Sequence, residues 1–323
     1  MRIIRSLAEV RDEDRGASAA LGNFDGVHRG HAAVLDLARR PETHPGAPLG
    51  VVTFEPHPRA FFAPEAPPFR LMNDAARAHR LEKLGVERLF VLPFDAALAA
   101  LSPEAFARDV LARGLGLSHV VVGADFRFGK GRAGDAEALR RLGAAHGFEV
   151  TVAPLLHAEE ERISSTAIRE ALLAGEPEKA ARMLGHWHRI DGTVAHGDKR
   201  GRDLGFPTAN LPLDGILPPR FGVYAVEVEV LTGPHAGRYA GAASLGVRPT
   251  FGINAPNLET YLLDFSGDLY GAEISVALIA FLRGEEKFDD VDALVAQMHR
   301  DVAEARARLA ETRAGWPQRS PAT

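Results

Sequence analysis

The order of hydrophobic and polar positions divides the chain into two parts with different patterns. From about residue 18 to residue 153, short continuous apolar runs alternate with segments whose apolar residues recur at helical spacing. The runs lie at 19–21, 49–54, 89–92, 120–122 and 150–152. Unbroken apolar strands, each followed by a helix, are typical of a parallel sheet covered on both faces. The ligands of such a sheet are expected at the carboxyl ends of its strands.

From about residue 186 the pattern changes to strand after strand, with no long helix between them. The expected strands span 189–194, 222–230, 238–247, 258–265 and 273–281. Turn residues separate them, which predicts an antiparallel sheet or a small barrel. A final helix is expected over about 291–309, where apolar residues again recur at helical spacing. We therefore expect one domain over 1–185, a second over 186–312 and a disordered tail over 313–323, with the hinge near 175–177.

Composition narrows the classes of function. A length of 323 residues suits two domains of roughly 150 residues each. The net charge of -5 gives no reason to expect nucleic acid as a partner, and the lack of cysteine excludes disulfides, thiolate metal sites and cysteine nucleophiles. No apolar run approaches the roughly 20 residues of a membrane span, and the N-terminus does not resemble a signal peptide. We expect a cytoplasmic protein that acts on small molecules, without nucleic acid or membrane partners.

The segment Leu21–His31, with the sequence LGNFDGVHRGH, carries the first candidate site. A strand ends here, glycines permit a tight turn, and a helix is expected to begin near Val27. His28 and His31 are three residues apart, so both are expected on one face of the first helical turn. The N–H groups of a helix N-terminus favour anions, and this arrangement suits a polyphosphate. A metal site is the weaker alternative, because no third ligand can be identified.

Three further segments of the first part suit phosphates or flat rings. In FEPHP the prolines hold Glu55 and His57 in an extended loop at a strand end. The run GADFRFGKG, from Gly123 to Gly131, combines two aromatic residues with glycines and charges. In RISSTAIR, a serine at 164 or 165 is expected to cap a helix, and three hydroxyls with an arginine one turn later form an anion cradle. Each segment alone also fits an ordinary loop or helix cap.

Together these four segments resemble the nucleotidyltransferase superfamily, and their full wording resembles the FMN adenylyltransferase module of bacterial bifunctional riboflavin kinase/FAD synthetases. The resemblance implies an α/β, Rossmann-like parallel sheet and transfer of an adenylyl group from ATP to FMN. It implies that His28 and His31 stabilise charge on the ATP α-phosphate. The implied ATP contacts are Gly22, Asn23, Phe24, Asp25, His28, His31, Ser164, Ser165, Thr166 and Arg169, the last four holding the β- and γ-phosphates. The implied FMN contacts are His57, Pro58, Asp125 and Phe126.

The second part contains a glycine-interrupted basic loop, GTVAHGDKRGRDLGFPTAN, from Gly192 to Asn210. It lacks the spacing of a P-loop, so a phosphate must be held differently. Thr208 and Asn210, two apart on an extended segment, point to one side and offer oxygens to a cation such as Mg²⁺. By itself this run fits a basic surface loop before an edge strand equally well.

The runs GVYA, GVRPTFG, LETYLLDF and DLYG farther along resemble the riboflavin kinase module of the same enzymes, a six-stranded antiparallel β-barrel with a C-terminal helix. The resemblance implies that Thr208 and Asn210 bind Mg²⁺ with ATP, and that Glu259 is the base that accepts the proton of the riboflavin 5′-hydroxyl. The implied contacts to ATP and flavin are Gly197, Lys199, Gly201, Gly205, Pro207, Thr208, Asn210 and Arg248.

Two positions depart from the family pattern. Ser244 stands where the family usually has Asn, and Tyr261 stands where a His commonly follows the glutamate by two positions.

The expected function is the synthesis of FMN from riboflavin and then of FAD from FMN, each step using ATP. One alternative is an adenylyltransferase whose second domain only binds flavin, and another is a flavin-responsive binding protein without activity.

Overall fold

The structure is a computed structural model that describes residues 1–39, 45–158, 161–196, 204–250 and 253–315. The chain forms two compact units. Unit 1 comprises Met1–Pro67 and Asp74–Ser164, and unit 2 comprises the short segment Pro68–Asn73 together with the chain from Ser165 onward.

Unit 1 is built on a six-stranded parallel sheet in the order β1-β4-β3-β2-β5-β8. Its strands are β1 (Arg2–Ile4), β2 (Ser18–Leu21), β3 (Leu49–Glu55), β4 (Arg88–Pro93), β5 (His119–Gly123) and β8 (Glu149–Ala153). All five strands predicted from the apolar runs are present, which confirms the parallel sheet. The pattern missed β1, which is short and pairs only with β4 at the edge of the sheet.

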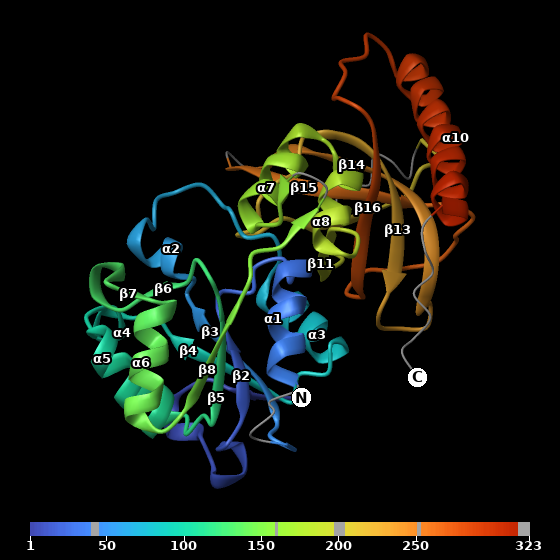
Figure 1. Cartoon of the computed structure of the whole chain (residues 1–323). Coiled ribbons are helices and arrows are strands. Elements are labelled where there is room, and N and C mark those ends of the chain that lie inside the picture. Colours follow the sequence, from blue (N-terminus) through green and yellow to red (C-terminus); the bar gives the residue numbers. More distant parts are fainter. Residues whose placement is uncertain (40–44, 159–160, 197–203, 251–252, 316–323) are drawn as a thin grey trace. The chain divides into compact units, whose positions relative to one another are not determined.

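Helices lie on both faces of this sheet, with α1 and α3 on one side and α6 on the other (Figure 1). The helical segments are α1 (Arg29–Arg39), α2 (Pro58–Phe62), α3 (Asp74–Lys83), α4 (Ala96–Ala99), α5 (Pro103–Ala105), a π-helical segment (Phe106–Gly114) and α6 (Ala136–His146). Short pieces complete the unit: β6 (Arg127–Phe128), β7 (Gly134–Asp135), β9 (His157–Ala158), β10 (Glu161–Arg162) and the 3-10 turns Leu7–Glu9, Asp12–Asp14 and Lys130–Arg132.

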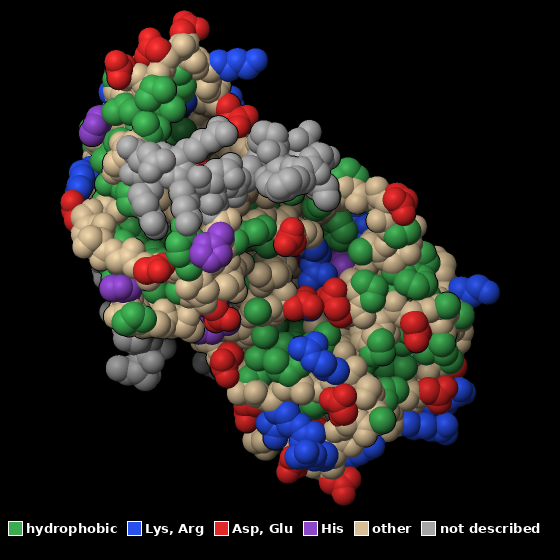
Figure 2. All heavy atoms as spheres, turned by 180° about the vertical axis from the view of Figure 1, so that it is seen from behind, with side chains coloured by type: hydrophobic (Ala, Val, Ile, Leu, Met, Phe, Trp, Pro, Cys, Tyr) green, Lys and Arg blue, Asp and Glu red, His purple; other side chains and the backbone are tan. Residues whose placement is uncertain are grey.

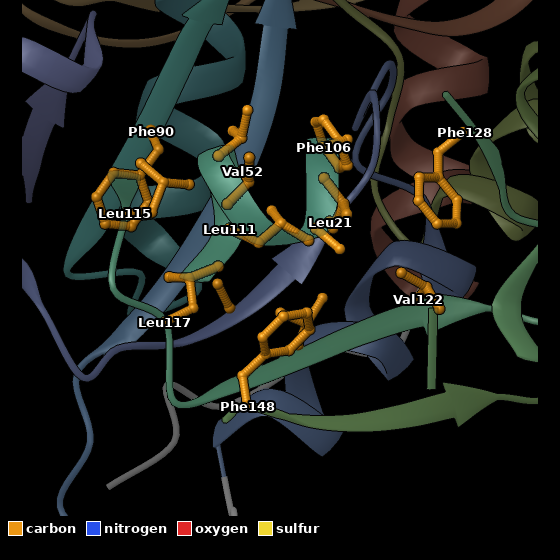
Figure 3. Packing of buried hydrophobic residues seen from close by; sticks show 14 of the residues in the cluster. Leu21, Val52, Phe90, Phe106, Leu111, Leu115, Leu117, Val122, Phe128 and Phe148 are labelled. Carbon is orange, nitrogen blue, oxygen red and sulfur yellow. The ribbon is translucent and has the colours of Figure 1, made fainter. Parts of the chain in front are cut away.

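The core of unit 1 explains why its strands are continuously apolar. Val52, Phe90 and Val122 project from the sheet onto Phe106 and Leu111 of the π-helical segment (Figure 3). Each of these five side chains is at most 5% exposed. Complete burial of one such side chain contributes about 1.5–3 kcal/mol. Because helices cover both faces, neither face of a strand needs polar residues, and alternation disappears.

Unit 2 contains a six-stranded antiparallel sheet in the order β11-β16-β13-β14-β15-β12. Its strands are β11 (Arg189–Thr193), β12 (Thr208–Pro212), β13 (Gly222–Val230), β14 (Gly237–Thr250), β15 (Ile253–Leu262) and β16 (Glu273–Arg283). The chain just after β11 bridges to β12, the strand at the other end of this order, where the amide of Ala195 donates to the Asn210 carbonyl at 2.9 Å. This bridge brings the two edges together, which confirms the predicted small barrel.

Helices α7 (Ser165–Ala174), α8 (Pro177–Leu184) and α10 (Val291–Gly315) complete unit 2. Helix α10 runs beside β13 and β16 (Figure 1). Its Ala305 packs onto the buried alanines 225, 242 and 277 on the outer face of the barrel, and such small residues let helix and sheet approach closely. The helix continues to Gly315, past the predicted end at 309 and three residues into the segment expected to be disordered.

The surface of the molecule carries charged side chains of both signs. Acidic and basic side chains are interspersed over the face of the molecule shown in Figure 2. Among the described residues, no helix combines the length and the apolar character that crossing a membrane requires.

Candidate functional sites

The sheet of unit 1 has a switch point between β2 and β5. From β2 the chain proceeds to β3 and β4 on one side, whereas β5 and β8 lie on the other side. The connections that leave two such neighbouring strands diverge to opposite faces, which opens a crevice at their carboxyl ends. The loop after β2, residues 22–28, and the loop after β5, residues 124–126, flank this point. The sheet topology therefore brings the first and third predicted segments to the same edge.

The loop after β2 has an unusual backbone. Phe24 and Val27 adopt positive φ angles of 53° and 43°, with Gly26 between them at 85°. Glycine accepts this region freely, but each of the two larger residues costs of order 1–3 kcal/mol there. Both side chains are only 1% exposed, and their burial offsets part of that cost. Helix α1 therefore begins at Arg29, two residues after the predicted start near Val27.

His28 and His31 cap the first turn of α1 reciprocally. His28 occupies the position before the helix, and its Nδ1 accepts the His31 amide at 3.2 Å, while Nδ1 of His31 accepts the His28 amide at 3.3 Å. The rings stack with centroids 3.6 Å apart and planes 14° apart. This is the geometry of a capping box, formed here by two imidazoles. The predicted placement of the two histidines on one side of the first turn is confirmed by the stacked rings, and His28 is the capping residue just before the helix.

The reciprocal cap fixes which ring nitrogen can donate outward. Since each Nδ1 accepts a backbone N–H, the proton of each neutral ring lies on Nε2. Burial, and next the neighbouring His28, lowers the pKa of His31 well below its usual value. His31 is therefore neutral near pH 7, and its Nε2–H is a fixed donor at the start of a helix, where anions are favoured.

Gly30 and Phe24 hold the pair in place. A Cβ at position 30 would lie 3.0 Å from the ring of His28, so only glycine lets that ring lie against the helix without displacement. The Phe24 ring also packs against His31, with 4.7 Å between the ring centroids. The space left by the missing side chain of Gly30 is thus filled by the neighbouring imidazole.

The FEPHP segment lies at the end of β3. His57 has an extended backbone and caps α2, with its Nδ1 accepting the Arg59 amide at 3.0 Å, and Pro58 is the first residue of that helix. His57 is only 8% exposed. The extended conformation predicted from the two prolines is confirmed for His57.

The loop after β5 turns immediately, because the Phe126 amide donates to the carbonyl of Gly123 at 3.0 Å. The half-buried ring of Phe126 stacks on Phe128, with centroids 5.6 Å apart, and Phe128 packs into the core of the unit. Asp125 is exposed at the turn. The loop thus presents a carboxylate and an aromatic ring beside the switch point.

The sequence pattern missed Arg77 of α3. This arginine is 1% exposed, and its guanidinium contacts the Asn23 carbonyl behind the loop after β2. A signal was available in the sequence: Arg77 lies four residues before the buried Leu81, on the face of α3 that packs inward. A charge at such a position has to be paired inside the protein.

The RISSTAIR segment spans the boundary between the units. Helix α7 begins at Ser165, so Ser164 occupies the capping position, and Thr166 follows within the first turn. Ser164 ends unit 1, while Ser165, Thr166 and Arg169 belong to unit 2. Nε of Arg169 donates to the Phe69 carbonyl at 2.7 Å, and the guanidinium lies 5.4 Å from the centre of the Phe69 ring. That these residues meet the histidine pair stays a prediction.

In unit 2, strand register brings the predicted kinase residues together. Thr208 of β12 lies opposite Tyr261 of β15, and Asn210 lies opposite Glu259. Residues directly opposite in an antiparallel pair project from the same face, so Thr208, Asn210 and Glu259 share one face. The predicted orientation of Thr208 and Asn210 to one side is therefore confirmed. Glu259 is also opposite Ser244 of β14, so both departures from the family pattern border this group.

The side chain of Asn210 is fixed by hydrogen bonds. Its Oδ1 accepts Nδ2 of Asn257 at 3.0 Å, and its Nδ2 donates to the Thr208 carbonyl at 3.3 Å. Both asparagines are at least nine-tenths buried. An amide oxygen has two lone pairs, so Oδ1 can accept this bond and still coordinate a cation.

The donor chemistry of this group fits a hard cation such as Mg²⁺. A hydroxyl, an amide oxygen and a carboxylate are all oxygen donors, which Mg²⁺ prefers. Among the described residues, no three or more histidines or acidic residues cluster as a metal site. Mg²⁺ commonly completes its coordination with phosphate oxygens and waters, so two protein oxygens are compatible with a metal–nucleotide complex.

Beside Thr208 lies a small, open hollow. Its lining includes Val194, Pro207, Thr208, Leu262, Phe265 and Tyr270. Gly205, at a φ of 85°, forms the turn that leads into this strand.

Four residues predicted for this site lie wholly or partly outside the described part of the chain. Gly197, Lys199 and Gly201 lie outside the described residues. Arg248 lies on β14 opposite Ala255 of β15, and only its backbone is described.

Known proteins match both units. Residues 10–167 match the family described as FAD synthetase, and residues 184–309 match the family described as riboflavin kinase. The bifunctional riboflavin kinase/FMN adenylyltransferase of Pseudomonas fluorescens is 43% identical over 311 residues, 96% of this chain and 98% of that protein. The protein of the same name from Escherichia coli K12 is 40% identical over 307 residues, 95% of this chain and 97% of that one.

A solved structure extends the match to the whole fold. A crystal structure described as a macrolide-efflux protein from Streptococcus pneumoniae superposes with a TM-score of 0.82 at 32% identity, covering 94% of this chain and 98% of that one. Relatives above 30% identity span nearly all of this chain, and both of its parts match by family. The chain therefore belongs to the family of bifunctional riboflavin kinases/FMN adenylyltransferases.

Proposed function

We propose that this chain makes FMN from riboflavin and ATP, and then FAD from FMN and a second ATP. The kinase step is assigned to a domain over 186–312 and the adenylyl transfer to a domain over 1–185. The observation that carries the proposal is that each unit presents its own polar site: the stacked histidines at the start of α1, and the oxygen group shared by β12 and β15. The two family matches, over residues 10–167 and 184–309, support the same division.

In the adenylyl transfer, an oxygen of the FMN phosphate attacks the α-phosphorus of ATP, and the bond to pyrophosphate breaks. The nucleophile is already an anion, so no base has to remove a proton, and catalysis rests on positioning and on charge stabilisation. We assign that stabilisation to His28 and His31, whose Nε2–H groups are fixed by the reciprocal cap. The remaining ATP contacts are assigned to Gly22, Asn23, Phe24, Asp25, Ser164, Ser165, Thr166 and Arg169.

FMN in this step is assigned to the edge of the sheet beside those histidines. The contacts proposed are His57, Pro58, Asp125 and Phe126. The support is topological, because the loop after β5 borders the same switch point as the loop after β2. A stacked aromatic pair such as Phe126 and Phe128 suits a flat ring.

In the kinase step, the riboflavin 5′-hydroxyl attacks the γ-phosphorus of ATP, and ADP leaves. We assign Glu259 as the base that accepts the hydroxyl proton. Thr208 and Asn210 would hold Mg²⁺ through their side-chain oxygens, and the metal when bound neutralises charge on the phosphates. The further contacts to ATP and flavin are assigned to Gly197, Lys199, Gly201, Gly205, Pro207 and Arg248.

Riboflavin, FMN and ATP are thus the proposed partners, and a cytoplasmic location, where ATP is available, is part of the proposal. The experiment that tests it is incubation of the pure protein with riboflavin, ATP and Mg²⁺, followed by chromatography of the flavins. We expect FMN to appear first and FAD to follow. FAD formed only from supplied FMN would instead select an adenylyltransferase with a flavin-binding second domain, and no turnover of either flavin would reject both.

A further inference from the structure

We propose that Arg77 is a positioning residue for adenylyl transfer, acting through the backbone of the loop after β2. The inference rests on the proposed function of that loop. Arg77 lies on α3, more than forty residues along the chain from the loop, and its side chain is 1% exposed. A buried guanidinium is costly unless its donors are used, so its partners indicate what it does there.

The guanidinium joins the ends of two neighbouring strands. Its Nη1 donates to the Asn23 carbonyl at 3.4 Å, just after β2, and its Nη2 donates to Oε2 of Glu55 at 3.1 Å, the last residue of β3. Nη2 also donates to Asp74 Oδ1 at 2.9 Å on its own helix. Arginine suits such a bridge because its planar fork presents several donors in fixed directions.

The Asn23 carbonyl is held from a second direction. The hydroxyl of Thr53, a fully buried residue of β3, donates to the same oxygen at 3.2 Å. Arg77 Nη1 also lies 3.5 Å from this hydroxyl, so the three groups form one closed set of contacts. Two donors on one carbonyl oxygen fix the orientation of the peptide plane that carries it.

The peptide plane between Asn23 and Phe24 is one of the two that define the φ angle of Phe24. The carbonyl of Asn23 and the amide of Phe24 belong to the same rigid unit, so holding the oxygen restrains the φ of Phe24. This angle is 53°, in the region that side-chain-bearing residues rarely adopt. The Phe24 ring in turn lies against His31, 4.7 Å between centroids. The structure thus gives a continuous path from Arg77 to the histidine pair.

Charge supports a positioning role over a direct effect on phosphates. The positive charge of Arg77 is met by the carboxylates of Glu55 and Asp74, both within 3.1 Å of Nη2. These two carboxylates offset the charge of the guanidinium where it lies. Arg77 therefore acts by holding the loop after β2 in position. A displacement of about 1 Å at a reacting group can lower a rate roughly 10²-fold.

The test compares Arg77→Met and Arg77→Lys, with both activities measured on each preparation. We expect Arg77→Met to lower kcat for FAD formation from FMN by about 10²-fold. The KM for FMN should change less than threefold, because the residues assigned to FMN are not among the partners of Arg77 named above. Arg77→Lys keeps the charge without the fork, and we expect it to recover about tenfold over the methionine variant. FMN formation from riboflavin, which uses unit 2, should stay at the wild-type rate in both.

A control variant separates the position of Arg77 from the loss of an arginine that is paired with an acidic side chain in the same unit. Arg88 begins β4, at the opposite end of the sheet, and pairs with the buried Asp14 at 2.9 Å. Arg88→Met should lower the stability of unit 1 while leaving kcat for FAD formation unchanged. If Arg77→Met does not fold, Arg77→Lys and Thr53→Val decide the question, each with kcat expected to fall about five- to tenfold.

Wild-type kcat for FAD formation in Arg77→Met, or in both substitute variants, would overturn the inference. An equal fall in Arg88→Met would do the same, because the effect would then follow stability alone. These outcomes are distinct from failure of the proposed function, in which the wild-type protein itself would form no FAD.

Discussion

The two units place the residues of their proposed sites in different ways. In unit 1 the histidines, His57 and Asp125 lie in loops or helix starts beyond the ends of parallel strands, and the first loop depends on positive φ angles at Phe24 and Val27. In unit 2, Thr208, Asn210 and Glu259 lie within strands, where register alone sets which residues are neighbours. A loop site therefore needs support from residues distant in sequence, such as Arg77, whereas a strand site needs only its partner strand.

The largest expected effect tests the strand site. Glu259→Gln keeps the size and the strand position but removes the carboxylate that we propose accepts the hydroxyl proton. A positioned base usually contributes about 10²–10⁴-fold, so FMN formation from riboflavin should fall by that factor. Adenylylation of supplied FMN should be unchanged, and both rates are measured on one preparation. A kinase rate within a few-fold of wild type would show that Glu259 is not the base.

The next effect tests the loop site. His31→Ala removes one fixed Nε2–H donor and the reciprocal cap of His28, so FAD formation from FMN should fall about 10²–10³-fold. Steady-state rates of both reactions provide the measurement. His79→Ala, at an exposed position on α3 in the same unit, is the control and should behave as wild type. Loss of FMN formation along with FAD formation in a folded variant would argue against separate sites.

A third prediction concerns stability in unit 2, away from either site. Burial, and next the neighbouring His186, lowers the pKa of His188 to about 3 from its usual 6.5. The unfolded chain takes up a proton below pH 6.5 and the folded chain does not, so stability present above that pH is lost as the pH falls toward 3. Between pH 7.5 and pH 5 the loss is about 2 kcal/mol, roughly 30-fold in the unfolding equilibrium.

Urea unfolding followed by tryptophan fluorescence, to which Trp187 beside this residue contributes, measures the effect. His188→Leu should remove this pH dependence and keep both activities near wild type, whereas His79→Ala should retain the wild-type slope. An unchanged slope in His188→Leu would mean that another group titrates. The contrast with unit 1 is that His31 uses its lowered pKa at a proposed site, while His188 affects stability alone.

The smallest expected effect tests whether Asn257 orients the proposed metal ligand Asn210 in the strand site. Asn257→Leu has similar volume but removes the donor to Oδ1 of Asn210. Loss of a partner that orients a metal ligand costs about 10–100-fold in metal affinity, so we expect the Mg²⁺ concentration for half-maximal kinase rate to rise about tenfold. Thr260→Val is the matched control. It lies in the barrel interior, and its buried hydroxyl has no hydrogen-bond partner among the described residues. An equal shift in both variants would contradict the orienting role.

Most strands and helices of both units could be predicted from the sequence, because the spacing of apolar residues along the chain reflects the local secondary structure. Five parallel strands and the antiparallel barrel follow from apolar runs and turns. The start of α1 was misplaced, because the positive φ of Val27 is imposed by packing and no local preference of valine predicts it. The short segment Pro68–Asn73 joins unit 2 through tertiary contacts, among them the Arg70 carbonyl with the Leu217 amide, and no periodicity signals such a contact.

For the sites, residue types were more predictable than their arrangement. The motif spacing pointed to His28 and His31, but the reciprocal cap and the ring stacking require coordinates. Asn257 was missed because its role follows from the register of β15 against β12, which the sequence alone does not fix. Arg77 could have been noticed as a charge on a buried helix face, yet its partners Asn23 and Glu55 lie far away in sequence.

The measurement that tests the two-site account most directly is complementation between Glu259→Gln and His31→Ala. Each variant is incubated alone and then mixed in equal amounts with riboflavin, ATP and Mg²⁺, and FAD is quantified. Alone, Glu259→Gln should leave riboflavin unconverted and His31→Ala should stop at FMN. Mixed, they should form FAD, because FMN released by one variant reaches the intact site of the other. A mixture that forms no more FAD than the separate variants would contradict independent sites in the two units.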